Sequence, residues 1–241
     1  MIHVHILPII PHNQNYAYFI QTAQGVSAII DPGEADPIIE FLDAHDFVPD
    51  YIINTHHHWD HVDGNAKITK RYGTKIIAPA KEKQRIGQVD IPLNDNESFD
   101  FGGDIMRTIE TPGHTAGALC YYFEESGIVF TGDTLFSMGC GRLFEGTPEQ
   151  MYISLQRLME LPDETLVYCG HEYTKGNAGF CLSYDRNNPV LRARIEEVKA
   201  LRKEGKPTLP TSIGLEKQTN IFMQAKSAEE FAALRKKKDN F

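Results

Sequence analysis

Residues 51–61 read YIINTHHHWDH, a short apolar run followed almost at once by four histidines and an aspartate. The β-branched apolar run is typical of a buried strand. Four imidazoles this close together would repel one another if protonated, so the pattern indicates a bound cation that keeps them neutral. In an extended chain His56 and His58 point the same way, while His57 points away. A surface cluster without a ligand is the alternative, and its place directly after a predicted buried strand argues against it.

Three further ligand-type residues share one position, just beyond a predicted strand and preceded by a glycine. They are His114 after residues 105–109, Asp133 after residues 128–130, and His171 after residues 166–169. Together with His56, His58, Asp60 and His61 they provide five imidazoles and two carboxylates, which suits two divalent ions such as zinc, iron or manganese. Asp133 is the natural bridge between two ions, because Asp60 belongs to the histidine-rich loop. Two such ions lower the pKa of a shared water, so the residues predict metal-dependent hydrolysis without a side-chain nucleophile.

The first 170 residues alternate short apolar runs with turns, which predicts an α/β architecture with strands in two sheets. Strands are predicted over residues 26–30, 51–53, 75–78, 105–109, 118–123, 128–130 and 166–169, and helices over residues 37–45, 148–161, 189–204 and 228–238. Strand-like runs nearly vanish after Gly170, and Ser227 with Glu230 forms a capping-box pattern that opens the last helix. We therefore predict a catalytic domain of residues 1–170 and a small helical domain of residues 171–241.

Composition narrows the class of protein further. The chain has 241 residues, of which 41% are hydrophobic and 24% charged, as in ordinary globular proteins. A net charge of −9 disfavours nucleic-acid binding. No apolar run reaches the length of a membrane helix, and the N-terminus lacks the features of a secretory signal. The four cysteines show no CxxC spacing, so we expect reduced thiols in a cytoplasmic protein, with Cys169 as a buried structural thiol. We further expect a monomer that acts on a small molecule.

Five short motifs stand out along the chain: DPG at 31–33, HHHWDH at 56–61, TPGH at 111–114, TGD at 131–133 and GH at 170–171. Together they resemble the metallo-β-lactamase superfamily. Four longer segments are GDTLF at 132–136, GCGRLFEGT at 139–147, GHEYT at 170–174 and LRKKKD at 234–239. Within the superfamily they resemble the glyoxalase II (hydroxyacylglutathione hydrolase) family, and the likeness runs over nearly the whole chain.

This resemblance implies an αββα metallo-β-lactamase-like sandwich with a small C-terminal α-helical domain. It also implies hydrolysis of S-D-lactoylglutathione to D-lactate and glutathione, the second step of methylglyoxal detoxification, by a hydroxide that bridges two metal ions. Zinc is the first candidate for these ions, with iron or manganese as alternatives.

Roles for individual residues follow from the same resemblance. One ion takes His56, His58 and His114, the other takes Asp60, His61 and His171, and Asp133 bridges; Asp60 and Asp133 count as the catalytic residues. The residues implied in glutathione binding are Arg142, Leu143, Phe144, His171, Glu172, Tyr173, Arg235 and Lys238. Cationic side chains suit the two carboxylates of glutathione. The basic run 235–238 is equally explained as a solvated helix end that the helix dipole favours.

Three positions depart from the family pattern without touching a predicted metal ligand. Phe144 stands where many relatives have Tyr, Asp63 where Gly is commoner, and Gln224 ends a segment that usually ends in Arg. Other activities of the superfamily remain as alternatives: a persulfide dioxygenase with one iron, or a β-lactam or lactone hydrolase. A nuclease is disfavoured by the negative charge, and a non-catalytic metal-binding protein by the number of ligands.

Overall fold

The computed structural model describes residues 1–10 and 14–241, which form two compact units. Unit 1 comprises Met1–Glu110 and Gly117–Ser126, and unit 2 comprises Thr111–Ala116 and Gly127–Phe241. His12, for which the sequence predicts no role, lies outside the described residues. Among the described helices, none combines the length and apolar character needed to cross a lipid bilayer.

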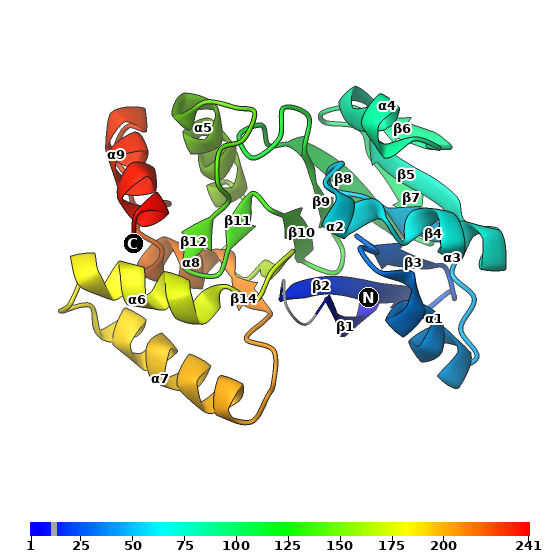
Figure 1. The fold of residues 1–241 in the computed structure, drawn as a ribbon, viewed down its shortest axis with the longest axis horizontal. Helices are drawn as coiled ribbons and strands as arrows, with labels where there is room; N and C mark the ends of the chain where they lie inside the picture. The colour runs from blue at the N-terminus through cyan, green and yellow to red at the C-terminus, as the bar shows by residue number, and fades with distance from the viewer. Residues whose placement is uncertain (11–13) are drawn as a thin grey trace. The chain divides into compact units, whose positions relative to one another are not determined.

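A six-stranded sheet in the order β1-β2-β3-β4-β5-β6 forms the centre of unit 1 (Figure 1). Its strands are β1 (Ile2–Ile10), β2 (Asn15–Thr22), β3 (Ser27–Ile30), β4 (Tyr51–Ile53), β5 (Lys75–Pro79) and β6 (Ile91–Leu93). The first three strands are antiparallel, and β3 to β6 run parallel. Parallel strands are covered on both faces and therefore consist of nearly unbroken apolar runs, which is why β4 and β5 are recognisable in the sequence.

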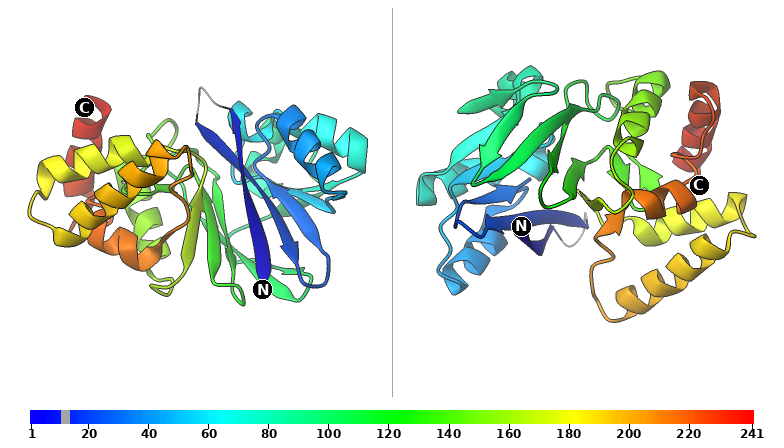
Figure 2. Two further views of the ribbon diagram at one scale, coloured as in Figure 1. Left: turned by 90° about the horizontal axis from the view of Figure 1, so that it is seen from below. Right: turned by 180° about the vertical axis from the view of Figure 1, so that it is seen from behind.

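One face of this sheet is covered by α1 (Ala35–Ala44) and α3 (Asn65–Tyr72) (Figures 1 and 2). The cluster between them includes Ile38, Leu42, Ile68, Ile29, Ile52 and Ile76. Side chains alternate along a strand, so Tyr51 faces the opposite side, where its ring lies 5.5 Å from that of Phe99.

Phe99 belongs to a second, antiparallel layer of unit 1 in the order β9-β8-β7. The strands are β7 (Ser98–Phe101), β8 (Asp104–Glu110) and β9 (Leu119–Phe123). Unit 1 also contains the short helices α2 (Trp59–Val62) and α4 (Lys83–Ile86), and a 3₁₀ turn at Ala80–Glu82. Unit 1 is thus built as helices, sheet and sheet, and α2 lies on the loop that leaves β4.

Unit 2 combines a few strands with most of the longer helices. Its strands are β10 (Ile128–Gly132), β13 (Leu166–Cys169), β14 (Thr211–Ser212) and the ribbon of β11 (Leu135–Phe136) and β12 (Gly139–Cys140). Its helices are α5 (Pro148–Met159), α6 (Thr174–Tyr184), α7 (Pro189–Lys203), α8 (Ile213–Thr219) and α9 (Ala228–Asp239). β10 and β13 are parallel neighbours, α5 packs on α9, and α6 lies beside α7 (Figure 2). Phe222 contacts the rings of Phe180 and Phe231 in the helical core.

The strands and helices predicted from the sequence are confirmed, each with ends within two residues of the prediction. The cap of α9 is also present, because the Ser227 hydroxyl accepts a hydrogen bond from the backbone N–H of Glu230. Sequence patterns miss α3, whose only buried apolar side chain is Ile68, and α6, which contains Gly176 and Gly179 and so has low helix propensity. The domain boundary at Gly170 stays a prediction.

Candidate functional site

The histidine-rich segment of unit 1 lies where the chain leaves β4 and enters α2. His56 Nε2 lies 3.1 Å from His58 Nδ1, so these two side chains do point the same way. Two nitrogens bound to one zinc ion in tetrahedral geometry are about 3.3 Å apart. The pair is therefore spaced as two ligands of one ion would be.

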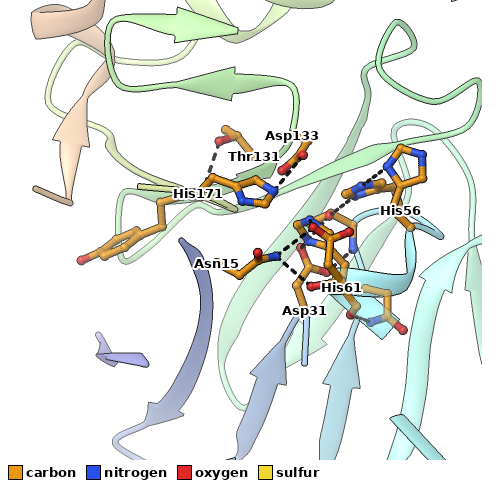
Figure 3. Close-up of polar contacts among 12 residues, drawn as sticks. Asn15, Asp31, His56, His61, Thr131, Asp133 and His171 are labelled. Carbon is orange, nitrogen blue, oxygen red and sulfur yellow. Dashed lines mark hydrogen bonds and ion pairs between the residues drawn. The ribbon is translucent and has the colours of Figure 1, made fainter. Parts of the chain in front are cut away.

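Asp31, at the end of β3, controls which ring nitrogens of two histidines are available. Its carboxylate is buried and accepts hydrogen bonds from the Thr55 backbone N–H at 2.7 Å, the Thr55 hydroxyl at 2.6 Å and His61 Nδ1 at 3.0 Å (Figure 3). Because the Thr55 hydroxyl donates to Asp31, its oxygen is left to accept from His56 Nδ1 at 3.0 Å. Both imidazoles then carry their proton on Nδ1 and present the Nε2 lone pair, as metal-binding histidines do.

Asp31 belongs to the DPG motif, but the sequence patterns assign no role in the site to Asp31 or Thr55. A signal for Asp31 exists nonetheless, because it stands directly beyond a buried strand like the three predicted ligands in unit 2. Its φ of +49° is unusual for a residue other than glycine and marks a constrained position.

The loop that carries Asp60 and His61 is packed directly on residues 31–33. A Cβ atom on Gly33 would lie 1.9 Å from the carbonyl oxygen of Asp60, and one on Gly64 would lie 2.4 Å from that of Pro32. Only glycine permits such close approach of two backbones. On this loop, Asp60 Oδ2 lies 3.9 Å from His61 Nε2.

In unit 2, two histidines converge on Asp133. Asp133 Oδ2 lies 3.1 Å from His171 Nε2 (Figure 3). It also lies 3.3 Å from His114 Nε2, and all three residues are buried. Asp133 and His171 follow the parallel neighbours β10 and β13, which bring their ends to one edge. Each histidine thus pairs an imidazole nitrogen with the Asp133 carboxylate oxygen, and both atom types are donors that divalent cations accept.

The ring of His114 is oriented by the main chain. Its Nδ1 lies 2.8 Å from the carbonyl oxygen of Arg142, which can only accept, so Nδ1 carries the proton and Nε2 faces Asp133. A Cβ on Gly141 would lie 2.0 Å from the Asp133 carbonyl oxygen. The GCGR segment therefore packs tightly on this part of unit 2 and needs glycine there.

His171 and His57 have different surroundings. The His171 ring stacks on that of Tyr173, with centroids 4.6 Å apart and planes 3° from parallel. His57 is buried, with Nδ1 2.8 Å from Glu82 Oε2, and Glu82 Oε1 accepts from the backbone N–H of Gly117. His57 is thus a core histidine with a structural partner.

The predicted glutathione-binding residues all lie in unit 2 but differ in exposure. Phe144 is 64% exposed and Tyr173 41%, and the side chain of Arg142 is 66% exposed. Leu143 is partly exposed, while Lys238 is half-buried and its Nζ donates to the carbonyl oxygen of Gly176.

Arg235 and Glu172 are buried and already have protein partners. Arg235 Nη1 donates to the carbonyl oxygen of Cys140 at 2.9 Å, and Nη2 and Nε donate to Asp239 Oδ1. Glu172 accepts from the Thr208 backbone N–H at 2.9 Å and from the Thr208 hydroxyl at 2.8 Å. A role for either residue in substrate binding stays a prediction.

The four cysteines are free and buried. Burial raises the pKa of the Cys140 thiol to about 11 and raises that of Cys169 well above its usual value. Both thiols therefore stay protonated near neutral pH, which makes them poor nucleophiles.

Comparison with known proteins identifies the class. Residues 10–171 match the model of the metallo-beta-lactamase superfamily, and residues 172–241 match that of the hydroxyacylglutathione hydrolase C-terminus. The B3 metallo-beta-lactamase BLEG-1 has a TM-score of 0.73 at 22% identity, covering 92% of this chain and 100% of that one. ETHE1 from Myxococcus xanthus has a TM-score of 0.70 at 25% identity, covering 97% and 90%. The chain thus has the metallo-beta-lactamase fold.

More similar sequences narrow this class. A hydroxyacylglutathione hydrolase of Chelativorans sp. (strain BNC1) is 46% identical over 231 residues, covering 90% of this chain and 91% of the relative. That of Methylococcus capsulatus is 41% identical over 251 residues, covering 98% of each. The chain belongs to the hydroxyacylglutathione hydrolase family. The predicted fold class and family are therefore confirmed, and the family together with the histidine and aspartate clusters supports binding of divalent metal.

Proposed function

We propose that this protein hydrolyses S-D-lactoylglutathione to D-lactate and glutathione at a centre of two divalent metal ions. The observation that carries the proposal is the convergence of His114 and His171 on one oxygen of Asp133, in a chain of this family. Membership of the family supports the thioester substrate, and the donor types support zinc as the first candidate for both ions.

We assign His56, His58 and His114 to one ion and Asp60, His61 and His171 to the other, with Asp133 as the bridge. The spacing of His56 and His58 supports a shared ion, and a catalytic zinc usually takes three protein ligands, so this pair needs a third. The superfamily model spans residues 10–171, which include all seven of these residues.

When bound, the ions would supply water activation at neutral pH and stabilisation of the oxyanion that develops at the thioester carbonyl. The contribution of the chain is to keep three of the proposed histidine ligands in one tautomer. Asp31 and Thr55 hold the ring protons of His61 and His56 on Nδ1, and the Arg142 carbonyl oxygen does the same for His114. The buried, protonated thiols leave attack to water, without a covalent intermediate on cysteine.

Recognition of the glutathione peptide is assigned to unit 2. Arg235 holds the carbonyl oxygen of Cys140, and the carbonyl oxygen of Arg142 holds His114, so the GCGR segment connects the basic end of α9 to a proposed ligand. Arg142 and Lys238 can receive the peptide carboxylates, with Leu143, Phe144 and Tyr173 alongside. Arg235, Glu172 and His171 remain proposed contacts of the peptide, and the buried hydrogen bonds of Arg235 and Glu172 also support this surface.

The reaction is tested by following loss of the thioester of S-D-lactoylglutathione and measuring the metal content of the same sample. We expect turnover that is abolished by a chelator and restored by zinc, with two ions per chain. Oxygen uptake with a glutathione persulfide and a single bound iron would instead favour the persulfide dioxygenase alternative. No thioester loss by the fully loaded protein would refute the proposal.

The assignment of the substrate surface is tested with Arg142→Ala, using Lys236→Ala as the matched control. Lys236 is an exposed cation in the last turn of α9, and we do not place it in the substrate site. A charge-assisted hydrogen bond is worth roughly 1.5–3 kcal/mol, so we expect KM to rise about tenfold or more for Arg142→Ala, with kcat affected less. Equal KM values for the two variants would contradict the assignment.

The buried free thiols support a reducing compartment, and we infer a cytoplasmic monomer. Light scattering of the purified protein checks the oligomeric state, and a mass of two chains would contradict it.

A further inference from the structure

The amide side chain of Asn15 contacts a proposed metal ligand within unit 1. Asn15 begins β2 and is only 1% exposed. Its Nδ2 lies 3.0 Å from the carbonyl oxygen of Asp60 and 3.1 Å from Asp60 Oδ2, so the one amide group donates to both (Figure 3).

Asn15 therefore fixes both the backbone carbonyl and the side-chain carboxylate of Asp60. The carbonyl oxygen of Asp60 lies between the Asn15 amide and Gly33, where a Cβ would approach to 1.9 Å. Its carboxylate is 16% exposed, whereas the side chain of the neighbouring His61 is fully buried. A carboxylate that is not fully buried keeps some rotamer freedom, and the hydrogen bond from Asn15 favours the rotamer seen in the structure.

The chemistry of this contact requires a donor at position 15. Both atoms that face Asn15 Nδ2 are oxygens that can only accept, which also decides the orientation of the amide. An aspartate of the same shape would set two carboxylates against each other. A leucine of similar volume would fill the space without making a hydrogen bond.

We propose that Asn15 is a positioning residue that orients the Asp60 carboxylate for metal binding. This inference rests on the proposed function, because it takes Asp60 as a ligand. Partners of metal ligands typically change metal affinity by about 10- to 100-fold when removed. Asn15 should act through Asp60 and on the ion that Asp60 binds.

The experiment compares Asn15→Asp and Asn15→Leu with the control Asn177→Asp. Asn177 is also a buried amide, but its Nδ2 donates to the carbonyl oxygen of Ser137 in unit 2. Each protein is stripped of metal, its thermal unfolding is recorded, and zinc is titrated in competition with a chromophoric chelator. We expect one zinc equivalent to bind about 10- to 100-fold more weakly in both Asn15 variants. Zinc affinity in Asn177→Asp should match the wild type.

A double variant separates positioning from a general effect on the fold. If Asn15 acts through Asp60, adding Asn15→Leu to Asp60→Asn should weaken zinc binding no further. Wild-type affinity in both Asn15 variants, additive losses in the double variant, or failure of both metal-free Asn15 variants to fold would each overturn the proposal. A wild-type protein that binds zinc but leaves the thioester intact would overturn the proposed function and not the role of Asn15.

Discussion

In an Asp31→Asn variant, the side chain at the end of β3 keeps its size but loses one acceptor oxygen and its charge. Asp31 has a φ of +49°, and asparagine is among the residues that tolerate this left-handed conformation best. The substitution therefore tests the carboxylate without adding backbone strain.

The magnitude follows from the three donors that face Asp31. The Asn oxygen can still accept from the Thr55 hydroxyl and from His61 Nδ1, but its NH₂ group then faces the Thr55 backbone N–H. A buried donor left without an acceptor costs about 1–3 kcal/mol, and each of the other two bonds loses about 1 kcal/mol with the charge. We expect the free energy of unfolding to fall by about 3–5 kcal/mol. Zinc affinity should fall about 10- to 100-fold, because the His61 ring is held less firmly.

Urea unfolding of the metal-free protein measures the change in the free energy of unfolding. Zinc titration of the folded, metal-free protein measures the change in zinc affinity. Asp46→Asn is the matched control, because Asp46 is exposed and has a φ of +54°. Its unfolding free energy should change by less than about 0.5 kcal/mol. An Asp31→Asn variant as stable as this control, with the zinc affinity of the wild type, would refute the reasoning.

Three further predictions concern other parts of the chain. Gly33→Ala should lower both the melting temperature and the zinc content, because the new Cβ would lie 1.9 Å from the Asp60 carbonyl oxygen. Burial, and then the charge of neighbouring His3, lowers the pKa of His5 below 6.5. The unfolded chain then binds more protons, so stability should fall as the pH drops below that value, and His5→Phe should flatten this dependence in urea unfolding at several pH values. The Cys140 thiol, with its pKa raised to about 11, should react with a thiol reagent only after unfolding; labelling of the native protein at neutral pH would contradict this.

The predicted strands were recognised from short apolar runs, and in the structure these runs are strands. The run at Tyr51–Ile53 is apolar throughout because helices cover one face of β4 and the β7–β9 layer covers the other. The chain then has to turn, and polar residues of ligand type stand at that turn. This is why His56, Asp133 and His171 could be singled out from sequence as residues that follow buried strands.

The basic end of the last helix shows where such local reasoning stops. The run 235–238 is compatible with either a solvated helix end or a substrate site, because four adjacent cations reveal nothing about their partners. In the structure, Arg235 is buried and donates hydrogen bonds to the Cys140 carbonyl oxygen and to Asp239, whereas Lys236 is exposed. Helical periodicity places these neighbours on different faces, and packing of α9 determines which face is buried.

The sequence alone was enough to predict the α/β class, seven of the described strands and the side chains proposed as metal ligands, because apolar runs, glycines and histidines are local features. It did not predict the two long strands β1 and β2. The partners that orient the proposed ligands depend on tertiary structure. Asn15 reaches Asp60 across 45 residues, and Asp31 reaches His61 across 30. Such contacts arise from strand pairing and from the close approach of loops, and no spacing along the chain encodes them.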